Sequence, residues 1–368
     1  MKILTISNCP LVESQGSGYI IVNFARRLQE RGHKVDLHGP EDIELFPSLE
    51  GRAKRYRQAL GMLIFCLRKT KEEQYDLIEF YGAEAWLTVS ILKRRKQRPF
   101  MVIHSNGLET NVAEVLSKHP ESSPPPKWYH LNQILRFEKA FKDVDGIVTV
   151  SKFERDYALD QGYQSKSRIL NIDNCLLDEF LDLEIEFERQ HVIAFCGNWR
   201  PIKGTQVIAR DMSRLLQDYP QSVLKLIGVG EDFKKEDVFE SSVCNQIEVT
   251  PFERDKNNLK AIYKSASILI MPSVYESFGL VSAEAMACGC AIIATKVGFP
   301  ADLKDKEEIM HIEGPTSPHL YNATKALLID DALRASIAKN GYDRVQSLRW
   351  GGAIDSIEKT YLQWLKNH

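Results

Sequence analysis

The chain has 368 residues, of which 43% are hydrophobic and 27% are charged. This length suits two domains of about 150 to 200 residues better than one core, and the composition is typical of soluble globular proteins. The formal net charge of −2 provides no overall positive field, so we expect no nucleic-acid partner, and any basic patch must be local.

The first residues predict a strand that begins without a signal-peptide layout, and the longest clean apolar run, residues 60–67, is too short to span a membrane. We therefore expect a cytoplasmic protein. The seven cysteines are an odd number scattered mostly through apolar segments, and Cys288-x-Cys290 has no second pair at zinc spacing. This pattern favours reduced structural thiols over a zinc site.

The N-terminal segment predicts a βαβ unit. A strand at 1–7 leads to a loop with Gly16 and Gly18, and a helix then runs from Ile21 to Arg31 before a second strand at 34–38. A doubly wound sheet admits a phosphate or sugar at its first turn, which makes Gly16 and Gly18 candidate ligand-binding residues. Two glycines alone more often mark a simple turn.

The βα alternation continues with predicted strands at 75–80, 100–104 and 146–150, and prolines 124–126 interrupt any helix between the last two. His104 ends one of these strands, before a loop that contains Gly107. A lone histidine is usually a satisfied structural residue. Its place at the carboxyl end of a strand nevertheless favours a contact with ligand.

Two basic segments stand out in this half of the chain. Residues 52–71 form a predicted helix with seven arginines and lysines around an apolar centre, and residues 93–98 close another helix. One interpretation is that both face anionic lipid headgroups. The alternative is a packed helix with a solvated basic face, and cations matched to the dipole at a helix end.

The second half begins with a predicted strand at 191–196, followed by Gly197 and a turn into a helix at 205–216. Arg200 and Lys203 lie just before this helix. Cations are unfavourable at a helix N-terminus unless an anion is also present, so the pair indicates a bound diphosphate. The alternative is that both are solvent-facing turn residues.

Residues 270–297 predict a strand, a loop, a helix at 281–287 and another strand at 291–295. Glu276 lies in the loop and Glu284 in the helix, and Gly279 lets backbone amides approach a ligand closely. A helix N-terminus suits a phosphate, and the next carboxylate can accept hydrogen bonds from a ribose diol. Alternatively, Glu276 is a solvated loop charge and Glu284 only favours the start of the helix.

The sequence of residues 276–289 closely resembles the Glu-x7-Glu signature of retaining glycosyltransferases of family 4, which have the GT-B fold. It reads Glu-Ser-Phe-Gly-Leu-Val-Ser-Ala-Glu-Ala-Met-Ala-Cys-Gly. Residues 31–35 and the Lys203-Gly204 pair also match the family, whereas its usual arginine position holds Asn198 and Arg200 lies two residues on.

The resemblance implies an α/β chain of the GT-B class, with two Rossmann-like domains facing across a cleft. It implies an N-terminal acceptor-binding domain at 1–172, a linker at 173–190, a nucleotide-sugar-binding domain at 191–349, and a C-terminal helix at 350–368 that crosses back to the first domain.

It further implies that a hexose passes, with retention, from a nucleotide diphosphate sugar to a hydroxyl of a glycan or lipid-linked acceptor, in the synthesis of cell-surface polysaccharide or glycolipid. We expect no cofactor and no metal in the site. The expected partners are the nucleotide-sugar donor, the glycan or lipid-linked acceptor and, by peripheral contact, an anionic membrane at its inner face. The implied catalytic residues are His104, Glu276, Lys203 and Arg200. The implied donor-binding residues are Gly16, Gly18, Gly197, Ser277, Phe278, Gly279, Leu280 and Glu284.

Two other classes of protein agree less well with these residues. A sugar-nucleotide-binding protein without transfer activity would lose His104 or Glu276, and both are present. A nicotinamide-dependent dehydrogenase would need a third glycine where Ile21 stands and an acid where the second strand ends at His38.

Overall fold

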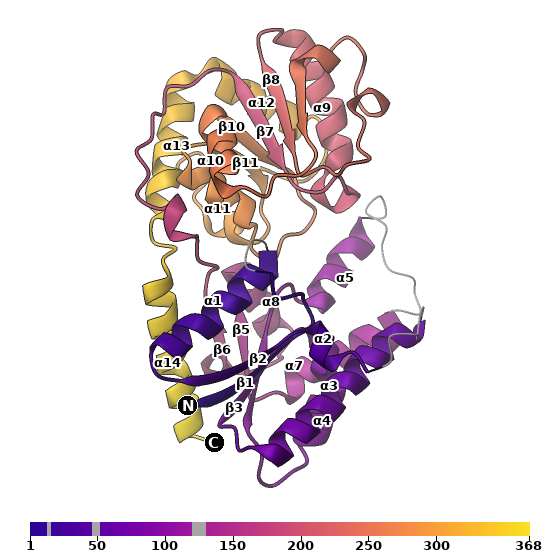
Figure 1. Cartoon of the computed structure of the whole chain (residues 1–368). Helices are drawn as coiled ribbons and strands as arrows, with labels where there is room; N and C mark the ends of the chain where they lie inside the picture. The colour runs from indigo at the N-terminus through magenta and orange to yellow at the C-terminus, as the bar shows by residue number, and fades with distance from the viewer. Residues whose placement is uncertain (13–15, 46–51, 120–129) are drawn as a thin grey trace. The chain divides into compact units, whose positions relative to one another are not determined.

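The computed structural model describes residues 1–12, 16–45, 52–119 and 130–368, without the side chains of 52–55, 130 and 131. Prolines 124–126 lie outside the described residues. The chain divides into two compact units (Figure 1). Unit one comprises Met1–Glu114, Pro125–Cys175 and Trp350–His368, and unit two comprises Val115–Pro124 and Leu176–Arg349.

Unit one is built on a six-stranded parallel sheet with the order β2-β1-β3-β4-β5-β6. The residues of β3 and β4 are all buried, as expected for parallel strands covered on both faces. The strands are β1 (Lys2–Ser7), β2 (Lys34–His38), β3 (Leu77–Tyr81), β4 (Phe100–His104), β5 (Gly146–Thr149) and β6 (Ile169–Asn171). The helices are α1 (Gly16–Glu30), α2 (Pro40–Ile43), α3 (Arg52–Glu72), α4 (Trp86–Leu92), α5 (Glu109–Lys118), α7 (Leu135–Asp143), α8 (Lys152–Asp160) and α14 (Trp350–Lys366).

Helix α14 packs on unit one through its aromatic residues. Trp350 meets Tyr19 and Phe24 of α1 edge to face, with ring centroids 5.9 and 5.1 Å apart. A Cβ on Gly146 would come within 2.6 Å of the Trp364 ring, so glycine is required where β5 passes under the end of the helix. The last helix is therefore part of the core of unit one.

A buried polar network ties α14 to three strands. The Glu79 carboxylate accepts hydrogen bonds of 2.6 Å from both Thr5 and Tyr361, and His104 Nε2 lies 2.6 Å from the Tyr361 hydroxyl. Burial opposes the ionisation of Glu79, but the bonds from His104, Thr5 and Tyr361 outweigh it and lower its pKa. The network thus holds one carboxylate charged inside the unit.

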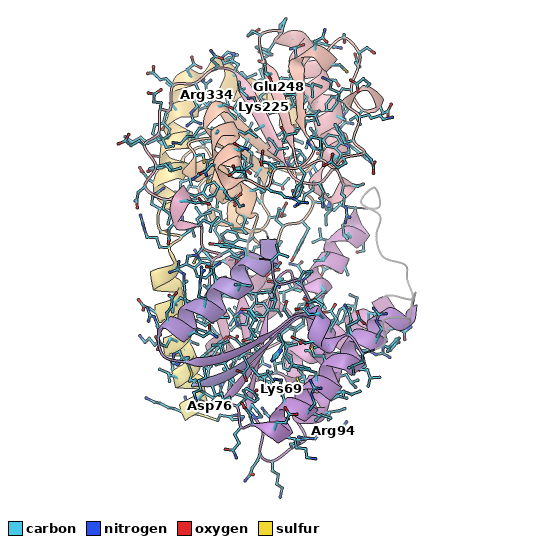
Figure 2. The ribbon with its side chains drawn as sticks, viewed as in Figure 1. Lys69, Asp76, Arg94, Lys225, Glu248 and Arg334 are labelled. Atoms are coloured by element: carbon cyan, nitrogen blue, oxygen red, sulfur yellow. The ribbon has the colours of Figure 1, made fainter. Side chains whose placement is uncertain are left out.

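Unit two contains a second six-stranded parallel sheet, with the order β12-β11-β10-β7-β8-β9. Its strands are β7 (Val192–Cys196), β8 (Val223–Ile227), β9 (Ile247–Thr250), β10 (Ile268–Met271), β11 (Ala291–Thr295) and β12 (Met310–Ile312). Its helices are α9 (Thr205–Asp218), α10 (Lys256–Ser265), α11 (Leu280–Ala287), α12 (His319–Ile329) and α13 (Asp331–Val345). Charged side chains pair across its outer strands, as Lys225 of β8 does with Glu248 of β9 at 3.4 Å (Figure 2).

Most predicted elements are confirmed, including the basic helix as α3, but the predicted loop at Gly16 and Gly18 is wrong. Both glycines lie in the first turn of α1. A Cβ on Gly18 would come within 2.4 Å of the Pro10 carbonyl oxygen, so this glycine allows the close approach of the preceding backbone. The apolar periodicity begins only at Tyr19, which is why the prediction began the helix late. None of the described helices is both long and apolar enough to cross a membrane.

Replacing Tyr361 with phenylalanine removes the hydroxyl that lies between Glu79 and His104. We expect the free energy of unfolding to fall by about 1–3 kcal/mol, because a buried carboxylate loses a donor. Urea unfolding of the whole chain measures this change. Tyr81→Phe is the matched control, since Tyr81 is 1% exposed and its hydroxyl has no hydrogen-bond partner in the described part of the chain.

The same variant has a defined pH dependence. Because the folded-state pKa of Glu79 lies below its ordinary value of 4.5, its contribution to stability is present above that value and is lost as the pH falls through the folded pKa. The difference between wild type and Tyr361→Phe should therefore narrow in acid. A difference that is constant with pH, or an equal loss in Tyr81→Phe, would contradict the assigned network.

Candidate functional site

The sheet of unit two reverses its strand order between β7 and β10. The chain passes from β7 to β8 and β9 on one side, and then returns to place β10 and β11 on the other. Parallel sheets bind ligands beyond the carboxyl ends of the strands at such a switch point. The loops after Cys196 of β7 and Met271 of β10 lie at this place, and they carry most of the residues predicted for the donor.

These two loops are bonded to each other. The Val274 N–H donates to the Ile202 carbonyl at 2.8 Å. Gly204 has φ +72°, and a Cβ there would come within 2.0 Å of the Pro272 carbonyl oxygen. The residue that starts α9 must therefore be glycine, both for its backbone conformation and for the contact with the neighbouring loop.

The contact brings Lys203 and Glu276 together. Lys203 Nζ lies 2.7 Å from Glu276 Oε1, and the Ser273 hydroxyl donates to the same oxygen at 2.7 Å. The two charged side chains keep 28% and 11% of their surface exposed. A lysine ammonium has three donors, so Lys203 can also bind an anion at the exposed side of the pair.

Gly279 and the start of α11 adjoin this pair. Gly279 is the N-cap of α11 with φ 90°, and its carbonyl accepts from the Ser282 hydroxyl at 2.7 Å. The resemblance implies that Ser277, Phe278 and Leu280 bind the donor, with the amides near Phe278 to Leu280 facing its phosphates. The Phe278 side chain lies in the core, stacked on Phe299 at 5.1 Å. Phe278 therefore anchors the loop through its ring and can offer a ligand only its backbone.

The second predicted carboxylate, Glu284, is paired with Lys256, whose Nζ lies 3.2 Å away. Burial raises the pKa of Glu284, and Lys256 opposes this rise. The Cys196 thiol at the end of β7 connects the two pairs. Burial raises its pKa to about 11, and it interacts electrostatically with Glu284, Lys256 and Lys203.

The sequence did not predict Lys256. It is the first residue of α10, and the carboxylate of the preceding Asp255 caps the helix by accepting from the Asn257 N–H at 2.8 Å. A lysine in the first turn of a helix is unfavourable for the helix dipole. This is the same signal that singled out Lys203, and it could have identified Lys256 as well.

Arg200 and Asn198 both lie on the exposed side of the loop after β7. Arg200 is the N-cap of the short segment that ends at Lys203, and its N–H donates to the Asn198 carbonyl at 2.9 Å. Among the described residues, no ion pair joins Arg200 to Glu276 or Glu284. Gly197 precedes them with φ 149°, and the Lys203 side chain passes 4.0 Å from the position of its absent Cβ.

His104, Gly16 and Gly18 belong to unit one. The His104 ring is 3% exposed and is held by Tyr361, Glu79 at 3.2 Å and the Tyr81 ring at 4.4 Å. These are the partners of a satisfied buried histidine, and its contact with a donor sugar stays a prediction. So does ligand binding by the two glycines.

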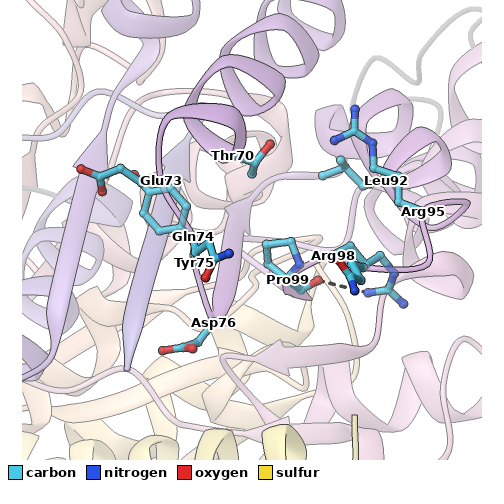
Figure 3. A pocket seen from close by; sticks show the side chains of 10 residues that line it. Thr70, Glu73, Gln74, Tyr75, Asp76, Leu92, Arg95, Arg98 and Pro99 are labelled. Atoms are coloured by element: carbon cyan, nitrogen blue, oxygen red, sulfur yellow. Dashed lines mark hydrogen bonds between the residues drawn. The ribbon is translucent and has the colours of Figure 1, made fainter.

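Unit one also contains a cavity of about 310 Å³ at the amino ends of β3 and β4 (Figure 3). Three of its charged side chains have partners: Arg98 binds Asp145 through both terminal nitrogens and donates to the Pro99 carbonyl, Asp76 accepts from the Lys2 N–H at 2.7 Å, and Glu73 pairs with the Lys2 ammonium. It lies at the sheet edge opposite to His104, so it does not belong to the predicted site.

Two Rossmann-like units, each built on a six-stranded parallel sheet, are the architecture of the GT-B class of proteins. Sequence comparison agrees with this class. A family model described as Glycosyltransferase Family 4 matches residues 14–171, and one described as Glycosyl transferases group 1 matches residues 181–344. The chain belongs to glycosyltransferase family 4.

Several relatives and solved structures are similar to the chain. The D-inositol 3-phosphate glycosyltransferase of Corynebacterium jeikeium is 28% identical over 189 residues, covering 49% of this chain and 45% of the relative. That of Corynebacterium glutamicum is 30% identical over 186 residues, covering 48% and 44%. The chain thus matches less than half the length of these curated relatives.

The similarity to solved structures extends over the whole chain and concerns the fold. Sucrose-phosphate synthase from Thermosynechococcus elongatus has a TM-score of 0.80 at 18% identity and covers 100% of both chains. Anabaena HepE, solved in complex with UDP and glucose, has a TM-score of 0.69 at 16% identity and covers 99% of this chain and 100% of its own.

The loop contact yields a prediction for Gly204→Ala. An alanine in the left-handed conformation lowers the free energy of unfolding by about 1–2 kcal/mol. We expect Gly204→Ala to lower it by more, because the added Cβ also meets the Pro272 carbonyl. Gly162→Ala is the control, since Gly162 has φ +61° and no atom within 4 Å of its Cβ position. Calorimetric unfolding compares the two. Equal losses would show that the contact between the loops does not constrain residue 204.

Proposed function

We propose that this protein transfers a hexose from a nucleotide diphosphate sugar to a hydroxyl of a glycan or lipid-linked acceptor, with retention of anomeric configuration. The observation that carries the proposal is the 2.7 Å pair of Lys203 and Glu276 at the switch point. A cation for the diphosphate and a carboxylate for the sugar lie side by side there. Glu284 supplies a second carboxylate for the ribose.

The chemistry follows from the charge that develops during transfer. When the bond between the anomeric carbon and the diphosphate oxygen breaks, its electron pair leaves with the diphosphate. Lys203 and the N–H groups at the start of α11 stabilise this charge, and Arg200 adds a second cation at the exposed side. In this proposal these groups do the work that a divalent cation does in other transferases.

Glu276 changes its partner during the same step. Its bond to Lys203 breaks, and Lys203 then binds the diphosphate. Glu276 accepts hydrogen bonds from the sugar hydroxyls, and its negative charge stabilises the oxocarbenium character of the sugar. Ser273 keeps the carboxylate oriented through its own bond. The acceptor hydroxyl attacks the face from which the diphosphate departs, gives its proton to the leaving phosphate oxygen, and so preserves the anomeric configuration. His104 contacts the donor sugar in this scheme.

The first test measures donor binding and transfer together. We expect UDP, GDP or ADP to raise the melting temperature, and the corresponding nucleotide sugars to yield a glycosylated product with a lipid or glycan acceptor. Lys203→Ala should lower kcat/KM by about 10²-fold or more, since it removes a charge that stabilises the leaving group.

Lys225→Ala is the matched control for Lys203→Ala. Lys225 lies in the same unit with a similar exposed fraction of 23%, and its pair with Glu248 lies on the outer strands (Figure 2). Stabilisation by none of the nucleotides, or equal losses in both variants, would refute the proposed site. Donor binding without any product would instead indicate a sugar-nucleotide-binding protein.

We further propose that unit one contacts an anionic membrane at its inner face and so meets a lipid-linked acceptor. Tyr56, Leu60 and Ile64 of α3 are spaced four residues apart on one helical face, and their exposed fractions are 43%, 38% and 43%. Arg136 of α7 stacks on the Tyr56 ring at 4.8 Å, and its neighbour Leu135 is 58% exposed. These residues define the α3 stripe.

Cations accompany the α3 stripe. Arg68 continues its four-residue spacing toward the end of the helix, Lys69 follows it, and Arg94 projects from the end of α4 (Figure 2). Apolar side chains with lysine and arginine at their borders suit the boundary between acyl chains and anionic headgroups. A solvent-facing helix would gain nothing from three exposed large apolar residues in one row.

The double variant Leu60→Gln/Ile64→Gln tests the stripe in vesicle sedimentation. We expect binding to vesicles with anionic lipid at low salt to weaken by about tenfold or more, because two apolar side chains no longer enter the boundary. Ile329→Gln is the control, since Ile329 is 66% exposed on α12 of unit two. No sedimentation of the wild type with anionic vesicles, or equal binding by all three proteins, would exclude the contact.

A further inference from the structure

Glu284 is a partly buried carboxylate with a cation at hydrogen-bond distance. Its side chain is 13% exposed and that of Lys256 is 23% exposed, with 3.2 Å between Lys256 Nζ and Glu284 Oε1. The two residues come from different helices, Lys256 from the first turn of α10 and Glu284 from the middle of α11. The Lys256 ammonium also lies over the Phe180 ring, with Nζ 5.9 Å from the ring centroid.

The groups around Glu284 act in opposite directions. Burial raises its pKa, and the nearby carboxylate of Glu179 raises it further. The neighbouring Cys196 thiol and the Tyr263 hydroxyl are kept neutral by burial, and Glu284 itself contributes to their raised pKa values. Lys256 is the group that lowers the pKa of Glu284. Without it, burial and Glu179 would both favour the protonated acid.

The protonation state of Glu284 matters for a ribose. An ionised carboxylate accepts hydrogen bonds from both hydroxyls of a diol, whereas a protonated one has lost part of its acceptor capacity. We propose that Lys256 is a positioning residue that keeps Glu284 ionised and oriented to accept from the two ribose hydroxyls of the nucleotide. This inference rests on the proposed function of the same site.

The experiment is a calorimetric titration of the full-length protein, over the range from about pH 6 to about pH 9, with whichever of UDP, GDP and ADP stabilises it most. In Lys256→Met the pKa of Glu284 should rise, so binding at the acid end should weaken by about tenfold for each pH unit below that pKa and should recover toward the alkaline end. Lys256→Arg should restore the profile of the wild type.

Lys260→Met is a closely matched control. Lys260 lies one turn further along α10, is 16% exposed, and its Nζ lies 5.8 Å from the centroid of the same Phe180 ring, but it pairs with Glu179 at 3.5 Å and not with Glu284. Its replacement removes the same charge and stem from the same helix face. Because Lys260 reaches Glu284 only through Glu179, its replacement should shift the pH profile of binding much less than Lys256→Met does.

The 2′-deoxy form of the same nucleoside diphosphate tests whether Lys256 acts through the ribose. It lacks one of the hydroxyls that would donate a hydrogen bond to Glu284. The Lys256→Met substitution should therefore weaken the binding of the deoxynucleotide less than the binding of the ribonucleotide. A Lys256→Met profile that runs parallel to the wild type, or tighter binding by this variant, would overturn the inference while leaving the proposed function intact. Failure of the wild type to bind any of the nucleotides would instead refute the proposed function.

Discussion

The candidate site depends on one backbone contact, the approach of the loop after β7 to the loop after β10. Gly204 lies against the Pro272 carbonyl, and the Val274 N–H bonds to the Ile202 carbonyl at 2.8 Å. The two loops belong to strands that are neighbours in the sheet but more than seventy residues apart in the chain. Their contact fixes the start of α9 beside the loop that leads into α11, so that groups from both can act on one ligand.

The charges of this site satisfy one another without a ligand. Lys203 bonds to Glu276 and Lys256 bonds to Glu284, so neither partly buried carboxylate lacks a cation. Unpaired charges at this depth would be costly, and paired ones are tolerated. In the proposed function, a ligand that carries both a diphosphate and hydroxyl groups replaces the bond between Lys203 and Glu276 with bonds of its own, while Lys256 continues to hold Glu284. The pairs therefore keep the side chains oriented for the ligand at little cost in new desolvation.

The sequence predicted the strands and the main charged residues because both have local signals. Apolar runs bounded by glycine or proline marked the strands, and the spacing within residues 276–284 marked the two carboxylates. The pairing of residues from distant parts of the chain has no such signal. Nothing near Glu284 indicates Lys256, 28 residues earlier, and nothing near His104 indicates Tyr361, which is 257 residues away.

The direction in which a side chain points could not be predicted from the sequence either. Phe278 stands inside the motif that resembles the family signature, yet its ring packs on Phe299 in the core. Gly18 reads as part of a ligand loop, yet the backbone of Pro10 and Val12 occupies the space beside it. In both cases the residue has a structural role inside a segment that the sequence assigns to ligand binding, and only the fold reveals that role.

The contrast between the two units bears on the part that His104 can play. Tyr361 donates to Glu79, and His104 Nε2 lies 2.6 Å from the Tyr361 oxygen and 3.2 Å from Glu79 Oε1. The charged pairs of unit two keep part of their surface exposed, whereas the residues of this network are buried. A substitution at His104 would therefore disturb the bonds that tie α14 to the sheet, besides any contact of His104 with a sugar.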